Sequence, residues 1–354
     1  MTVILGGILL AVTVPARFGT TGSFFVVSEM VVWLLGLTVA ALACRWAFGQ
    51  LHLSVALFLV GLGAVFSSLF QLGQTDNWWK FAGSTGVTVI ALLLVDRLRP
   101  FIRRGTLFVL IFANLTMDFR SMAVLCIVVL LVDVLSKPVG RLGARRPASV
   151  LLYLSGIVGI TAITINQVIV SGLAGAGLQE RAVRQTALGQ NPILGGRTEW
   201  GATMELMRIY PPGFGVGSTP STFAMSEAMT GVRGVGGDTA GPYFYSQVFG
   251  DRVDLHSSLA NVWFHFGVLG FVAAAIVGLY LLLGVTRIFQ NVRPFEMAVA
   301  FLGLLACWDL LFSPMASAAS IAVAAGAIGG SRPSAKVIVA PTPSNSEYKS
   351  AMLI

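Results

Sequence analysis

The stretch SLANVWFHFGVLGFVAAAIVGLYLLLG, residues 258–284, decides the fold class of this chain. It is longer than the roughly 20 apolar residues that a helix needs to cross the hydrocarbon core of a bilayer. It contains no Asp, Glu, Lys or Arg. A helix of this kind is stable in lipid because its backbone hydrogen bonds are all made within the segment. The stretch therefore predicts a membrane-spanning helix.

The composition of the whole chain supports the same conclusion. Of the 354 residues, 56% are hydrophobic and 11% are charged, and the mean hydropathy is +0.83. A soluble globular chain carries about 25% charged residues. The polar side chains are too few to cover a water-exposed surface, which excludes a soluble enzyme, a disordered chain and a secreted disulfide-bonded scaffold. We expect an all-α polytopic membrane protein.

The pattern of apolar runs predicts about ten transmembrane helices. The runs are 2–16, 24–43, 51–70, 81–96, 105–117, 121–136, 149–170, 258–284, 295–312 and 315–330. With a cytoplasmic N-terminus, the inner segments hold fourteen Lys and Arg residues, and the short outer segments hold three: Arg17, Lys80 and Arg120. Cytoplasmic loops accumulate Lys and Arg, so the bias predicts that both termini are cytoplasmic. The same rule accounts for the net charge of +8 without nucleic acid.

The expected organisation follows from these runs. Residues 1–170 hold the first seven transmembrane helices, with the first run read as a span rather than a cleaved signal peptide. Residues 171–257 form one long extracytoplasmic loop. Residues 258–330 hold the last three helices, and the polar, Pro- and Ser-rich tail 331–354 is expected to be a disordered cytoplasmic segment.

The long loop is expected to be folded, because aromatic residues recur along it. A connection of this length is uncommon unless it is functional or disordered. Trp200, Met204 and Met207 are spaced at i, i+4 and i+7, which predicts an amphipathic helix over 198–209 at the membrane interface. A Gly-rich turn, Pro212-Gly213-Phe214-Gly215-Val216-Gly217, follows it.

The sequence contains no P-loop, GxSxG, HExxH or Cys/His cluster. Its three cysteines, Cys44, Cys126 and Cys307, lie far apart in apolar runs and are expected to be core residues. The nearest approach to a metal site is Asp251-x-x-Asp254. We interpret this pair as a solvated turn, so no metal is expected, although two carboxylates on an outer loop could share a divalent cation.

A few charged or titratable residues at the membrane boundary are candidates for function, since burying such groups is costly. Arg120 either pairs with Asp118 at the interface or faces an anionic ligand. Asp309, near the outer end of the ninth run, either orients a cation or is satisfied by a neighbouring helix, which we favour. His256 stands where the loop re-enters the membrane, where it could exchange a proton near neutral pH or bond at a helix start.

Three blocks, in order, resemble the O-antigen ligase and O-antigen polymerase family of bacterial membrane glycosyltransferases (the Wzy–WaaL type). The first is Asp118-Phe119-Arg120-Ser121, which keeps only the arginine of the family motif. The second is Gly196-Arg197-Thr198-Glu199-Trp200 followed by the turn Pro212–Gly217. The third begins at His256 and includes Leu259, Gly267 and Gly270. Two positions depart from the family pattern: Ser257 replaces the usual Asn, and His265 stands where an acid is common.

The resemblance implies transfer of a glycan from an undecaprenyl-diphosphate carrier to an acceptor hydroxyl, on a glycan or a lipid, at the outer leaflet of the bacterial inner membrane. Arg120 and Arg197 match the arginine positions of the family and would bind the diphosphate, because guanidinium is always charged and bidentate. His256 would act as general base or as donor to the diphosphate. The implied substrate-binding set is Arg120, Arg197, Gly215, Gly217 and Asp309, and neither metal nor cofactor is expected.

Several readings stay open at this point. Polymerase and ligase share the donor chemistry and differ in the acceptor. A multi-span transporter or a flippase for lipid-linked glycans would use the intramembrane charges as a pathway. It should also show paired half-chain repeats, which the sequence lacks. A non-enzymatic scaffold that binds glycan on the outer loop would not require Arg120, Arg197 and His256 together.

Overall fold

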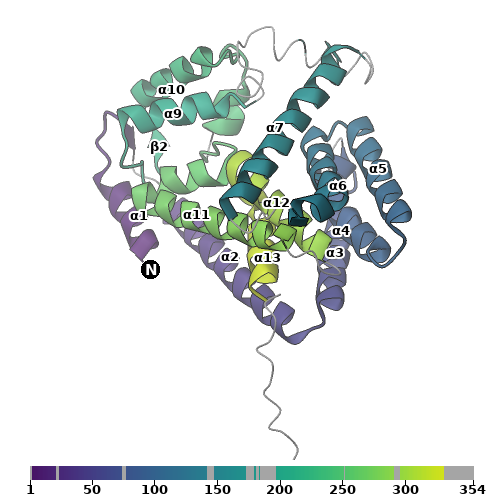
Figure 1. The fold of residues 1–354 in the computed structure, drawn as a ribbon. Coiled ribbons are helices and arrows are strands. Elements are labelled where there is room, and N and C mark those ends of the chain that lie inside the picture. Colours follow the sequence, from purple (N-terminus) through teal and green to yellow (C-terminus); the bar gives the residue numbers. More distant parts are fainter. Residues whose placement is uncertain are drawn as a thin grey trace, which may run out of the picture.

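The computed structural model describes residues 2–20, 24–73, 77–141, 147–172, 179–180, 183, 197–250, 252–290 and 296–330. The protein is about 79% helical, and the strands it contains are two residues long (Figure 1). The all-α prediction is therefore confirmed. The tail 331–354, most of 171–196 and Asp251 lie outside the described residues, so the disordered tail stays a prediction.

Every predicted apolar run coincides with a helix. The helices of the first seven runs are α1 (Thr2–Thr13), α2 (Phe24–Gln50), α3 (Leu53–Leu69), η1 (Trp79–Gly83) continuing into α4 (Ser84–Val95), α5 (Pro100–Thr116), α6 (Arg120–Arg141) and α7 (Pro147–Val170). Those of the last three are α11 (Ser258–Gln290), α12 (Glu296–Phe312), and η3 (Met315–Ala318) with α13 (Ala319–Gly330). The long loop contains α9 (Glu199–Ile209), α10 (Thr222–Gly234) and η2 (Phe244–Val248), and β1 (Gly19–Thr20) pairs with β2 (Thr219–Pro220).

The apolar helices differ in length, and length decides which of them can cross a membrane. Among the described residues, two helices are long and apolar enough to cross a membrane, Val27–Gln50 and Ser258–Gln290. Four shorter apolar helices run over Leu53–Leu69, Trp79–Val95, Met297–Phe312 and Ala319–Gly330. At about 1.5 Å per residue, α1 and α13, with 12 residues each, are shorter than a hydrocarbon core of about 30 Å. Ten helical runs are thus present, whereas ten crossings are not established.

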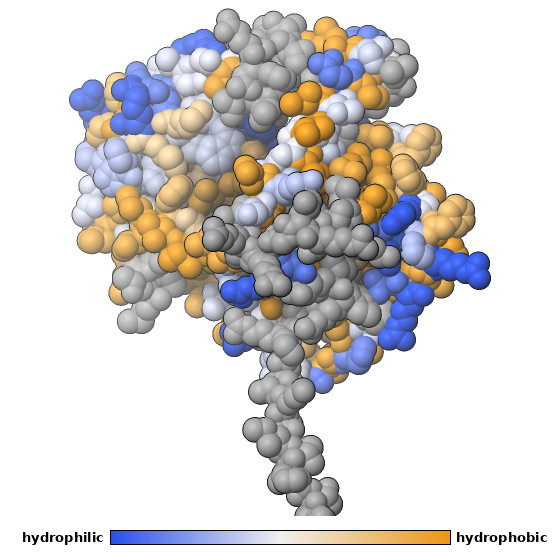
Figure 2. Space-filling model, in the orientation of Figure 1, coloured by the Kyte–Doolittle hydropathy of each residue, from blue (hydrophilic) through white to orange (hydrophobic). Residues whose placement is uncertain are grey.

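The main hydrophobic core lies around α12, whose residues 297–306 are buried. Side chains from α3 to α6, α11 and α13 surround it, among them Leu57, Leu92, Leu107 and Leu281. On the outside, large apolar residues of α2 and α3 are exposed, among them Val39 and Phe66. Figure 2 shows hydrophobic residues across the middle of one face and hydrophilic residues gathered over α9 and α10.

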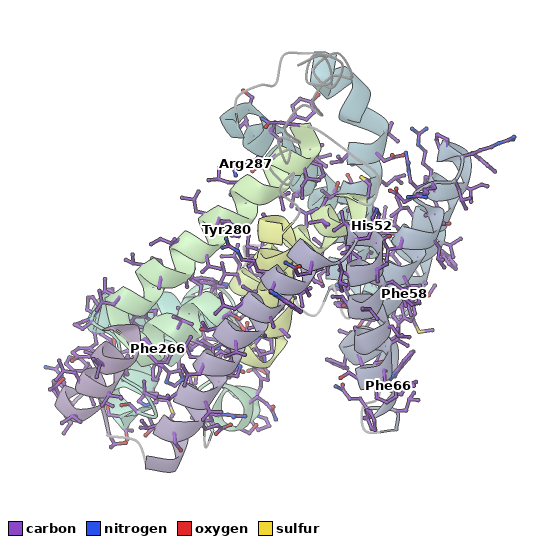
Figure 3. All side chains as sticks on the ribbon, turned by 90° about the horizontal axis from the view of Figure 1, so that it is seen from below. His52, Phe58, Phe66, Phe266, Tyr280 and Arg287 are labelled. Atoms are coloured by element: carbon purple, nitrogen blue, oxygen red, sulfur yellow. The ribbon has the colours of Figure 1, made fainter. Side chains whose placement is uncertain are left out.

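The side-chain view gives the direction of the long helices. In Figure 3, α11 runs from Phe266 through Tyr280 to Arg287, and α3 runs in roughly the opposite direction, from His52 through Phe58 to Phe66.

The described part of the long loop has a hydrophobic core of its own, distinct from the main one. This core joins α9, α10, the 243–255 segment and the start of α11, through Leu206, Ala228, Phe244 and Phe264, among others. Helix α9 confirms the helix predicted over 198–209, and its small residues pack on α10, where Gly201 lies against the backbone of Gly231. The described loop residues 197–250 and 252–257 are thus a folded unit, called the outer unit after the side of the membrane predicted for it.

A break in α11 at Gly267 joins the outer unit to the bundle. Gly267 has φ 68° and ψ −159°, so the helix is interrupted there and the carbonyl oxygen of Phe264 loses its partner in the following turn. The backbone N–H groups of Phe214 and Gly215 donate to that oxygen instead, at 2.8 and 3.0 Å. The N–H of Val216 donates to the carbonyl of Gly7 in α1, at 3.1 Å. The glycine-rich turn Pro212–Gly217 therefore lies between α1 and α11.

Candidate functional site

Arg197 stands just before α9, facing the outer end of α12. Its guanidinium carbon lies 5.8 Å from the ring centroid of Trp308 and 5.9 Å from that of Phe312, at cation–π range. The indole N–H of Trp200 donates to the carbonyl of Leu311 at 3.0 Å, which ties the start of α9 to the same helix end. Within the described residues, no hydrogen bond or ion pair engages the Arg197 side chain. Aromatic rings thus orient this cation while its N–H donors keep no acceptor in that part of the protein.

Asp309 lies in the helix turn between those two aromatic rings. Its carboxylate accepts from the hydroxyls of Ser313 at 2.7 Å and Ser320 at 2.5 Å, and the residue is buried. These contacts agree with the reading of Asp309 as an acid satisfied locally. Its role in substrate binding stays a prediction.

His256 occupies a strained turn directly before α11. Its φ is 48°, a conformation that is uncommon for a residue other than glycine. The turn is held by Asp254, whose Oδ1 accepts from the backbone N–H of His256 at 2.9 Å. The ring Nδ1 lies 3.0 Å from the carbonyl oxygen of Asp254. A carbonyl can only accept, so this contact assigns the proton of the neutral ring to Nδ1 and leaves the lone pair on Nε2.

Two further residues, Asn261 and Ser257, stabilise this turn, although Ser257 replaces the asparagine that is usual in the family. The side-chain amide of Asn261 donates to Asp254 Oδ1 at 2.8 Å, and its oxygen accepts from the N–H of Leu255 at 2.7 Å. Ser257 accepts from the N–H of Ala260 at 3.2 Å, as a helix-capping residue does. An asparagine one helical turn later therefore supports the turn at His256.

Asp254 is thus engaged in positioning His256. Its predicted partner in a metal pair, Asp251, lies outside the described residues. Across the described ranges, no group of three or more His, Cys, Asp or Glu residues is arranged to hold a metal ion.

Tyr243, which precedes η2, connects the two parts of the site. Its ring centroid lies 5.9 Å from that of His256, and its hydroxyl donates to the carboxylate of Glu199, two residues after Arg197. Burial, followed by the charge of Glu199, raises the pKa of Tyr243 above its ordinary range, and the charge of Arg197 opposes the rise. The phenol therefore stays protonated at neutral pH.

Sequence reasoning did not assign a role to Tyr243 or Glu199. Tyr243 was one aromatic of a Tyr-Phe-Tyr run, and Glu199 was one residue of the Gly196–Trp200 block. A signal was present in hindsight, because an acid in the first turn of a predicted helix is common, but an acid that is also buried there is not. That second property is visible only in the fold.

The structure brings together two of the three predicted catalytic residues. Arg197 lies two residues before Glu199, which accepts from the hydroxyl of Tyr243, and the ring of Tyr243 lies 5.9 Å from that of His256. Arg120, at the start of α6, has its Nε 3.4 Å from Asp118, and Lys80 lies 3.8 Å from the same carboxylate. Among the described residues, no hydrogen bond, ion pair or ring contact joins Arg120 to Arg197 or His256. The interfacial pairing with Asp118 is therefore the observed environment of Arg120.

The glycines assigned to substrate have a packing role. Gly213, Gly215 and Gly217 are buried and have φ of 94°, 97° and 74°, which favour glycine. A Cβ on Gly215 would meet the backbone of α1 at Leu10 and Ala11. Whether Gly215 or Gly217 also contacts a substrate stays a prediction.

His265 is buried beside this turn. Its ring lies 5.1 Å from that of Phe264, at an angle of 84°. It faces the protein interior at the α11 break and is not part of the Arg197–Tyr243–His256 arrangement.

Comparison of the chain with protein-family models, with curated proteins and with solved structures finds no match.

Proposed function

We propose that this chain transfers a glycan from undecaprenyl diphosphate to an acceptor hydroxyl at the outer surface of a membrane, as a member of the O-antigen ligase and polymerase group. The observation that carries the proposal is the connection of the segment that holds Arg197 to His256 through the contacts of Tyr243. These residues are separated by more than fifty positions in the sequence. Two of the three blocks that resemble the family thus supply neighbouring groups.

The transfer step requires a cation that stabilises the leaving diphosphate and a base that accepts the proton of the acceptor hydroxyl, and this site contains both. Arg197 is a fixed guanidinium without an acceptor in the described residues, so it can hold two oxygens of a diphosphate. His256 has its Nδ1 proton directed at a carbonyl, so Nε2 can take a proton from the acceptor hydroxyl. Of the two roles left open for His256, the hydrogen bonding favours general base.

The proposed step can be written with its atoms balanced. The acceptor oxygen attacks the anomeric carbon of the donor sugar while its proton moves to His256 Nε2. The bond between that carbon and the diphosphate oxygen breaks, and its electron pair leaves with undecaprenyl diphosphate. Negative charge accumulates on the diphosphate, where Arg197 stabilises it. The proton on His256 is released to water or to the leaving diphosphate.

The membrane arrangement that this function needs is part of the proposal. Two long apolar helices and the exposed apolar face of the molecule support insertion in a bilayer. We extend this to a multi-pass arrangement in the bacterial inner membrane with the outer unit on the extracytoplasmic side and both termini in the cytoplasm. The excess of Lys and Arg in the inner segments supports that orientation.

The test is transfer by the purified protein in lipid nanodiscs, with lipid-linked glycans extracted from the source cells as donor and acceptor. Arg197→Lys keeps the charge and loses the two-pronged geometry, and His256→Ala removes the base. We expect either change to lower transfer about 100-fold, in line with loss of one transition-state group. Arg233→Lys, on the exposed surface of α10, is the matched control. Full activity of Arg197→Lys and His256→Ala would refute the proposed site.

Arg120 separates two versions of the proposal. If the arginine acts only through its pair with Asp118, Arg120→Lys should leave transfer unchanged, because lysine can make the same ion pair. If it binds the diphosphate, as the resemblance implies, the same substitution should weaken donor binding. The structure as described favours the first outcome.

A further inference from the structure

The contact between Glu199 and Tyr243 has no part in the function proposed above. Glu199 is 7% exposed and lies in the first turn of α9. A buried carboxylate is costly unless it is hydrogen-bonded, and the tyrosine hydroxyl donates to this one. The bond crosses from α9 to the segment before η2, so it links the element that carries Arg197 to the one that faces His256.

The geometry around this bond sets what the phenol can do. Its proton is directed at Glu199, so its oxygen offers lone pairs to a donor on the other side. Arg197 lies two residues before Glu199, and the ring of Tyr243 lies 5.9 Å from that of His256. The hydroxyl of Tyr243 thus contacts the first turn of the helix that follows Arg197, and its ring contacts the imidazole of His256.

We infer that Glu199 and Tyr243 are a pair of positioning residues, which fix the separation between the cation that binds the diphosphate and the base that activates the acceptor. The inference rests on the proposed function. Glu199 orients the tyrosine, and the tyrosine in turn limits the positions that the Arg197 guanidinium and the His256 ring can adopt. Neither residue exchanges a proton with the substrate in this account.

A positioning role differs measurably from a structural one. If Tyr243 only filled space, its hydroxyl would be dispensable and the ring alone would suffice. If it aligns two reacting groups, loss of the hydroxyl should lower the rate of the chemical step, because small misplacements of reacting groups cost about 100-fold. Donor affinity should be retained, since Arg197 keeps its charge and its contacts with the rings of Trp308 and Phe312. The two cases therefore separate in kcat and KM.

The experiment compares Tyr243→Phe and Glu199→Gln in nanodiscs, with lipid-linked glycans extracted from the source cells. Tyr245→Phe, two residues on in η2, and Glu205→Gln, on the same helix as Glu199, are matched controls. We expect kcat to fall about 10- to 100-fold in the two test variants, with the donor KM changed less than about twofold, the pattern of an interaction specific to the transition state. The controls should match the wild type.

A second variant guards against loss of folding. Tyr243→Phe leaves a buried carboxylate without its partner, which can destabilise the protein. Tyr243→Phe combined with Glu199→Leu removes both polar groups and should restore the melting temperature. Its kcat should stay as low as that of Tyr243→Phe alone, because residues that act as a unit are not additive. Recovery of kcat along with stability would overturn the positioning role.

The outcomes also separate this inference from the proposed function. Wild-type protein that neither transfers glycan nor binds undecaprenyl diphosphate would refute the proposed function. Wild-type protein that transfers glycan, with Tyr243→Phe equally active, would leave the function standing and overturn the inference. A rise in donor KM without a fall in kcat would overturn it as well.

Discussion

Substituting Gly215 by alanine distinguishes a packing role for the glycine-rich turn from a substrate-binding one. Gly215 has φ 97°, and its N–H donates to the carbonyl of Phe264 at the α11 break. A Cβ at this position would lie 2.5 Å from the carbonyl carbon of Leu10 and closer still to the backbone of Ala11. These neighbours are main-chain atoms of α1, which cannot rotate away as a side chain can.

The magnitude follows from two costs. Holding an alanine in a sparsely populated backbone conformation costs about 1–3 kcal/mol. Adding volume against a fixed backbone costs about 1–3 kcal/mol more as neighbouring elements shift. We therefore expect Gly215→Ala to lower the free energy of unfolding by about 2–6 kcal/mol. At roughly 2–4 °C per kcal/mol, this corresponds to a fall in melting temperature of about 4–24 °C.

The assay is thermal unfolding of purified protein in detergent, with Gly36→Ala as the control. Gly36 lies within α2, where a Cβ would meet nothing within 4 Å, so alanine should leave the melting temperature unchanged or slightly raised. A Gly215→Ala protein that melts with the wild type would refute the packing argument. If Gly215→Ala melted with the wild type but had lost transfer, the result would support the predicted contact of Gly215 with substrate instead of the packing role.

Three further predictions concern other parts of the molecule. Asp133→Asn removes the carboxylate that pairs with Arg103 and is expected to cost about 3 kcal/mol of stability, because it leaves a partly buried cation uncompensated. Glu29 is exposed, so Glu29→Gln should lower the free energy of unfolding by less than about 1 kcal/mol. Equal melting temperatures for the Asp133→Asn and Glu29→Gln proteins would contradict this difference. In intact cells, an impermeant maleimide should label Ser226→Cys on α10 and spare Arg99→Cys before α5; the reverse pattern would overturn the orientation. Glycan transfer should persist in EDTA. A loss of transfer that added Mg²⁺ reverses would show that a metal cation contributes to the charge stabilisation assigned to arginine.

The sequence by itself determined the fold class and the positions of the helices. An uninterrupted apolar run such as 258–284 has few alternatives to a helix, because lipid offers no partner for its backbone groups. The spacing of Trp200, Met204 and Met207 was likewise sufficient to predict α9. These are local properties, since each depends on residues within a few turns of one another. The recurrence of aromatics along 197–250 also predicted correctly that this part of the loop is folded.

Tertiary structure alone decided which of the candidate residues meet. The 258–284 run predicts one continuous helix. In the fold, backbone N–H groups of the Pro212–Gly217 turn donate to the carbonyl oxygen of Phe264, and the helix is interrupted at Gly267. The pairing of Arg120 with Asp118 and the meeting of Arg197 and His256 at Tyr243 are equally invisible to periodicity. The physical reason is that such contacts join residues distant in sequence. They are selected by how the two hydrophobic cores pack, and no local pattern records that packing.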